Sequence, residues 1–119
     1  MRYFSKKGAA YTLNDEHHVP EQLVSLGFIE MREDWPGKPY VAREDGTWSI
    51  DEQAAFEMLR NERDKRLAAC DYRALPDFPQ TDEQKERVLT YRQALRDLPA
   101  MVGAPWDGGG PLTPWPELT

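Results

Sequence analysis

Cysteine, histidine and long apolar runs are scarce in this sequence of 119 residues. A lone Cys70 forms no intramolecular disulfide, and two histidines, His17 and His18, are too few for a four-ligand Cys/His zinc site. No run of about 20 apolar residues is present, so we expect no membrane-spanning helix. Lys6 and Lys7 precede no apolar stretch, so no signal peptide is expected. A single reduced cysteine favours the cytoplasm.

An excess of positive charge is also lacking. The formal net charge is −6 at pH 7, and acidic and basic side chains are interspersed along the chain. Nucleic-acid binding generally requires a stripe of Lys and Arg that replaces counterions, so we predict no nucleic-acid partner. A content of 39% hydrophobic and 30% charged residues is typical of a folded globular protein.

Groups for catalysis or cofactor binding are equally sparse. His17 and His18 follow Asp15 and Glu16, but adjacent histidines point in different directions, so a solvated loop is favoured over a metal site. Cys70 has no base nearby in sequence and is better explained as a small buried residue on a helix. Three consecutive glycines at 108–110 lack the Lys-Ser/Thr of a phosphate loop. We therefore expect no enzyme, no cofactor and no metal.

The N-terminal part of the chain, residues 1–50, is predicted to be a small antiparallel β unit. Aromatic and β-branched residues alternate with turn signals, and Gly46 suits a hairpin turn. Pro20 can open a short helical turn that Gly27 closes. The predicted strands cover residues 2–5, 9–13, 28–31, 40–43 and 47–50.

Residues 51–99 are predicted to form an antiparallel helical hairpin, which makes the fold class α+β. Ser49 with Glu52, and Thr81 with Gln84, have the spacing of capping boxes. The first helix should cover residues 51–70, and Pro99 should end the second. A buried seam is expected between the helices. Its predicted members are Leu59, Leu67, Val88, Tyr91 and Leu95.

Residues 100–119 form a segment rich in Pro, Gly and Trp, without periodicity. It is predicted to be extended or disordered unless Trp106 and Trp115 anchor it. Docking on the hairpin and docking on a partner both remain open. Arg92 has two alternatives as well: a cation–π contact with one of these tryptophans, or an ion pair with Asp71 or Glu62 across the hairpin.

Exposed aromatic and arginine side chains are frequent at protein interfaces, and this sequence offers no other chemistry for recognition. The predicted partner-binding residues are Trp48, Tyr91, Arg92, Trp106 and Trp115.

A family resemblance is carried by residues 56–99 and, more loosely, by Trp115-Pro116. The segments that carry it are Arg60-Asn61-Glu62-Arg63-Asp64, Asp71-Tyr72, Leu75-Pro76-Asp77 and Tyr91-Arg92-Gln93-Ala94-Leu95-Arg96-Asp97-Leu98. They resemble the C-terminal region of phage tail assembly chaperones. The N-terminus is similar to the opening strands of tail fibre assembly proteins. The matching segments there are Tyr3-Phe4-Ser5, Ala9-Ala10-Tyr11 and Val19-Pro20.

The resemblance implies a non-catalytic phage or prophage protein of the bacterial host cytoplasm. Such a protein would bind an unfinished tail or tail-fibre subunit and prevent its aggregation. The alternative is a structural adaptor that stays in the tail particle. Homo-oligomer formation remains open, and no membrane partner is expected.

Overall fold

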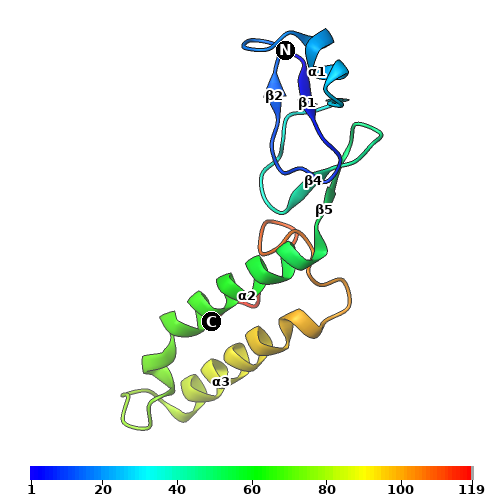
Figure 1. Ribbon diagram of the computed structural model, residues 1–119. Helices are drawn as coiled ribbons and strands as arrows, with labels where there is room; N and C mark the ends of the chain where they lie inside the picture. The colour runs from blue at the N-terminus through cyan, green and yellow to red at the C-terminus, as the bar shows by residue number, and fades with distance from the viewer. Residues whose placement is uncertain (119) are drawn as a thin grey trace. The chain divides into compact units, whose positions relative to one another are not determined.

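The computed structural model describes residues 1–118, which form two compact units (Figure 1). The first unit is Met1–Ala54, and the second begins at Ala55. Short antiparallel sheets are combined with helices, so the fold is α+β and the predicted fold class is confirmed. Within residues 1–118, no helix has the length and apolar character needed to cross a membrane.

The first unit contains a three-stranded antiparallel sheet, a short helix and a separate β hairpin. The sheet has the order β2-β1-β3, with β1 in the middle, and β4 pairs with β5. Phe4 of β1, Leu23 of α1 and Met31 of β3 are buried and form its core. The elements are β1 (Tyr3–Ser5), β2 (Leu13–Asn14), α1 (Pro20–Ser25), β3 (Ile29–Met31), β4 (Tyr40–Ala42) and β5 (Trp48–Ile50).

The strand predicted at residues 9–13 is largely irregular. Only Leu13 and Asn14 pair with β1. The backbone of Gly8 donates to the carbonyl of Ala42 at 2.8 Å, and Ala42 N–H donates to the carbonyl of Ala9 at 2.9 Å. Because residues 8 and 9 satisfy their hydrogen bonds on β4, they do not pair with β1.

The second unit is a helical hairpin followed by a folded tail. Helix α2 (Glu52–Ala69) begins in the first unit and is connected to α3 (Asp82–Asp97) through the 3₁₀ turn η1 (Asp71–Ala74). A second 3₁₀ turn, η2 (Leu98–Ala100), follows α3. Figure 1 shows α2 and α3 running side by side.

One of the two predicted capping boxes is confirmed. Thr81 Oγ1 accepts from the N–H of Gln84 at 3.1 Å, and Gln84 Oε1 accepts from the N–H of Thr81 at 2.9 Å. The other prediction is wrong, because Ser49 lies in β5. Asp51, two residues later, accepts instead from the N–H of Ala54 at 3.4 Å.

The buried seam of the hairpin differs in part from the predicted one. Leu59, Val88 and Leu95 are almost fully buried, as predicted. Leu67 and Tyr91 are only half-buried, and Arg92 rather than Tyr91 is buried. Helical spacings of three and of four residues both keep a side chain on one face, so the apolar pattern alone did not determine this register.

Candidate partner-binding site

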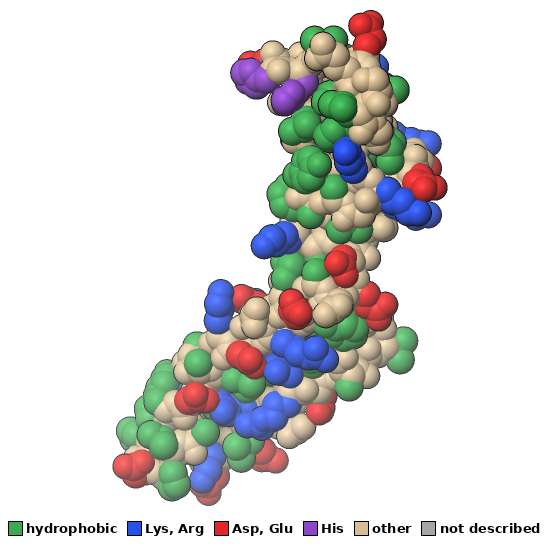
Figure 2. Space-filling model, viewed as in Figure 1, with side chains coloured by type: hydrophobic (Ala, Val, Ile, Leu, Met, Phe, Trp, Pro, Cys, Tyr) green, Lys and Arg blue, Asp and Glu red, His purple; other side chains and the backbone are tan. Residues whose placement is uncertain are grey.

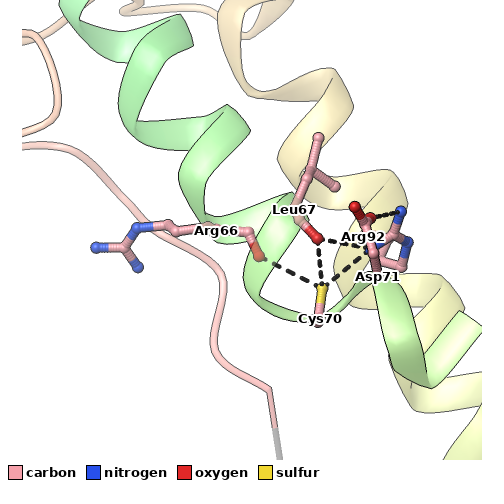
Figure 3. Close-up of polar contacts among 5 residues, drawn as sticks. All are labelled: Arg66, Leu67, Cys70, Asp71 and Arg92. Atoms are coloured by element: carbon pink, nitrogen blue, oxygen red, sulfur yellow. Dashed lines mark hydrogen bonds and ion pairs between the residues drawn. The ribbon is translucent and has the colours of Figure 1, made fainter.

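Arg92 of α3 crosses the hairpin and binds the end of α2 (Figure 3). Its guanidinium donates to the carbonyl of Leu67 at 2.9 Å, to Cys70 Sγ at 3.1 Å and to Asp71 Oδ1 at 2.8 Å. Only 8% of Arg92 is exposed. The ion pair with Asp71 is one of the two alternatives that the sequence left open. The predicted ion pair across the hairpin is therefore confirmed, and the predicted cation–π contact of Arg92 with a tryptophan is wrong.

The geometry around Arg92 satisfies polar groups at the C-terminus of α2. The last carbonyls of a helix have no partner within that helix, and a cation near them is favourable. The Cys70 thiol bonds the carbonyls of Arg66 and Leu67, each at 3.4 Å. Burial lowers the pKa of Arg92, but hydrogen bonds to Asp71 and Cys70 outweigh it and raise that pKa overall. The guanidinium therefore remains charged and fixes the start of the turn.

The turn after this network is closed by a hydrogen bond and presents apolar side chains to solvent. Gln80 Nε2 donates to the carbonyl of Arg73 at 2.7 Å, which closes the turn before α3. Tyr72 and Phe78 pack edge to face, with ring centroids 5.1 Å apart. Tyr72 and Leu75 are each 53% exposed. We call Tyr72, Leu75 and Phe78 the hairpin tip. Figure 2 shows hydrophobic side chains at this end of the hairpin, with acidic and basic side chains among them.

The tail folds back on α2 through Trp115. The Arg66 guanidinium lies over the indole ring, 4.0 Å from its centroid, and Arg66 also pairs with Glu62 at 3.3 Å. Trp115 Nε1 donates to the carbonyl of Gly109 at 3.1 Å. The cation over Trp115 is thus Arg66, because the Arg92 guanidinium is occupied inside the hairpin.

A loop centred on Asp107 holds the tail in shape. Its carboxylate accepts from Gly110 N–H at 2.9 Å, Leu112 N–H at 3.0 Å and Thr113 Oγ1 at 2.8 Å. Burial opposes ionisation, but these hydrogen bonds hold the pKa of Asp107 below its ordinary value. Residues 101–113 consequently form successive turns and bends. The sequence predicted an extended tail only if the tryptophans did not anchor it, and Trp115 does contact α2.

Tyr91 and Trp106 are half-buried in the second unit. Tyr91 lies at an open cleft of about 380 Å³ between α3 and the end of the tail. The other residues of this cleft are Glu83, Glu86, Arg87, Thr90 and Glu117. Trp106 has a φ of 49°, and its N–H donates to the carbonyl of Gly103 at 3.1 Å. Both side chains therefore keep part of their surface available to a partner.

Trp48 belongs to the first unit, on β5. It is half-buried, and its indole N–H donates to the carbonyl of Glu33 at 3.1 Å. A cleft of about 440 Å³ adjoins it. The other residues of that cleft are Arg32, Glu33, Pro36, Tyr40, Gly46 and Thr47. The five predicted binding residues thus occupy separate places: Arg92 is inside the hairpin, and Trp48 is in a different unit.

His17 and His18 are exposed on the segment between β2 and α1. His17 Nε2 lies 4.0 Å from a Glu16 carboxylate oxygen. Across residues 1–118, no group of three His, Cys, Asp or Glu side chains is arranged to hold a metal ion. Cys70 is buried, as predicted, although it lies directly after the end of α2 and not on the helix.

Sequence reasoning missed three features of this region: the exposed hairpin tip, the Arg66–Trp115 contact and the Asp107 loop. A signal for the first was present, since Tyr72 and Leu75 lie between two helices beside prolines, where apolar side chains have little core to enter. Glu62 and Arg66 have the i,i+4 spacing of a helical ion pair, and that spacing gives no indication of a contact with Trp115. An Asp directly before a glycine run is a turn signal that could have predicted the loop.

The second unit is thus a helical hairpin with exposed apolar side chains at its turn and a tail that contacts α2. The model of the phage tail assembly chaperone protein family matches residues 56–118, which is more than half of the chain. The chain therefore belongs to the phage tail assembly chaperone family. No curated protein and no solved structure matches it.

Proposed function

We propose that this protein binds an unfinished phage tail or tail-fibre subunit and prevents its aggregation before assembly, without catalysing a reaction. Membership of the tail assembly chaperone family carries the proposal. A chaperone of this kind needs exposed apolar surface and reversible binding. The half-exposed aromatic residues and the hairpin tip supply such surface.

Client contact is assigned in this proposal to aromatic side chains that keep exposed area. Trp48, Tyr91, Trp106 and Trp115 are the candidates from the sequence, and each is half-buried. A single aromatic anchor at an interface can contribute roughly 2 kcal/mol or more. Arg92 acts indirectly here, because a buried guanidinium bound to α2 orders the hairpin rather than touching a client.

The family match runs from Phe56 to Leu118, so the hairpin and the tail are the parts that we assign to the chaperone role. The division into residues 1–50, 51–99 and 100–119 stays a prediction. We place the activity in the cytoplasm of the bacterial host, where tail subunits are made.

Co-production with a tail or tail-fibre subunit tests the proposal. The expected result is that the subunit is soluble and co-purifies with this protein, and that it aggregates when produced alone. Mass spectrometry of purified phage particles then separates the chaperone from the structural adaptor. Absence from the particle supports the chaperone, and a stoichiometric copy number in the particle contradicts it.

A further inference from the structure

The hairpin tip combines exposed apolar side chains with a backbone that hydrogen bonds hold at both ends. Its start is held by Arg92, and its end is held by the Gln80–Arg73 hydrogen bond. A surface that is ordered before binding loses less conformational entropy when a partner docks. Exposed apolar groups on a rigid turn therefore contribute more to binding than the same groups on a mobile loop.

The charges around the tip indicate the chemistry of its partner. Residues 71–83 contain four acidic side chains and one basic side chain, Arg73. The acidic residues are Asp71, Asp77, Asp82 and Glu83. The Asp71 side chain remains 63% exposed although it pairs with Arg92, and that of Glu83 remains 78% exposed although it pairs with Arg87. The sequence around the apolar patch is thus richer in carboxylates than in cations, and the paired carboxylates of Asp71 and Glu83 stay accessible to solvent.

This charge pattern distinguishes between two occupants. A second copy of the chain would bring two acidic rims together, and like charges across an interface are unfavourable. A segment with Lys or Arg beside its apolar residues would place opposite charges against the rim. Charge complementarity therefore favours a basic, apolar segment of another protein.

We propose that the hairpin tip is the docking surface for a client segment whose apolar residues are flanked by Lys or Arg. This inference rests on the proposed chaperone function and adds to it the place of contact and the chemistry of the bound segment. Tyr72 and Leu75 provide the apolar contact, and the carboxylates around them set the preference for a basic segment.

A pair of synthetic peptides tests the charge preference. Both peptides carry the same Leu- and Val-rich centre, flanked by lysines in one and by glutamates in the other. Fluorescence anisotropy with the full chain should show binding of the lysine peptide about tenfold tighter at low salt. Added salt should reduce that difference, because exposed charges are screened. Equal affinity for the two peptides would overturn the proposal.

Variants locate the contact. Leu75→Ser removes an exposed apolar side chain, so the fold should persist, and affinity for the lysine peptide should fall about fivefold. Val102→Ser is the matched control, because Val102 is fully exposed elsewhere in the same unit. It should bind like the wild type. Unchanged affinity in Leu75→Ser, or dimerisation through the tip measured by sedimentation, would contradict the assignment.

The same variants separate this inference from the proposed function. If the wild type keeps a co-produced tail subunit soluble and Leu75→Ser fails to do so, both stand. If both proteins keep the subunit soluble equally well, the tip is the wrong surface and the chaperone function stands. If the wild type does not affect subunit solubility, the proposed function itself fails.

Discussion

Arg92→Ala should destabilise the helical hairpin by about 2.5–3.5 kcal/mol. The change removes a charge-assisted bond to the Leu67 carbonyl, for which about 1.5 kcal/mol is a fair magnitude. The ion pair with Asp71 adds at most about 1 kcal/mol, because the Asp71 side chain is 63% exposed. Loss of the buried aliphatic stem accounts for about another 1 kcal/mol.

Urea denaturation followed by far-ultraviolet circular dichroism measures this effect on the helices. With a slope of about 2 kcal/mol per M urea, the midpoint of Arg92→Ala should fall by about 1.5 M. Lys85→Ala is the matched control, since Lys85 is a long basic side chain on the exposed face of the same helix. Its midpoint should change little. If the midpoints of the two variants coincide, the buried network does not stabilise the hairpin and this reasoning is refuted.

Three further predictions follow from the packing and the tail. Leu95→Ala should cost about 2–5 kcal/mol in unfolding free energy, because Leu95 is fully buried between the helices; a cost under about 1 kcal/mol would place the seam elsewhere. Trp115→Ala and Arg66→Ala, combined in a double-mutant cycle, should show a coupling of about 0.5–1 kcal/mol; strictly additive effects would mean that the tail is not docked through this pair. Asp107 has a lowered pKa, so its stabilising effect is present above its ordinary value of 3.8 and is lost as the pH falls through the lower folded value. Asp107→Asn should therefore lower the melting temperature at neutral pH and have little effect in strong acid, and an equal decrease under both conditions would contradict this.

Local chemistry made much of the fold predictable from sequence. The Thr81 capping box lies where its spacing places it, and the β hairpin around Gly46 forms between the expected strands. These features depend on a few neighbouring residues, because a cap satisfies N–H groups within one turn and a glycine permits a positive φ. Gly46 has a φ of 85°, and a Cβ there would approach the Glu30 carbonyl to 2.8 Å.

The choice of the side chain buried between the helices, and the docking of the tail, could not be predicted from local sequence in this way. Tyr91 and Arg92 occupy adjacent positions, and the apolar pattern favours Tyr91 for the seam. Arg92 is buried instead, because the C-terminus of α2 supplies acceptors that compensate its burial. The docking of the tail likewise depends on two contacts. Arg66 contacts Trp115, which is far along the chain, and Asp107 binds Thr113 within an irregular loop. The amino-acid composition of the tail alone cannot predict these contacts.

The aggregation of a tail or tail-fibre subunit diluted from denaturant, followed by light scattering, tests the central claim most directly. In the presence of an equimolar amount of this protein, scattering should be suppressed and the subunit should be recovered in a defined complex with it. Leu75→Ser should suppress scattering less well, and Val102→Ser should act like the wild type. Scattering that rises equally with and without the wild-type protein would contradict the chaperone function.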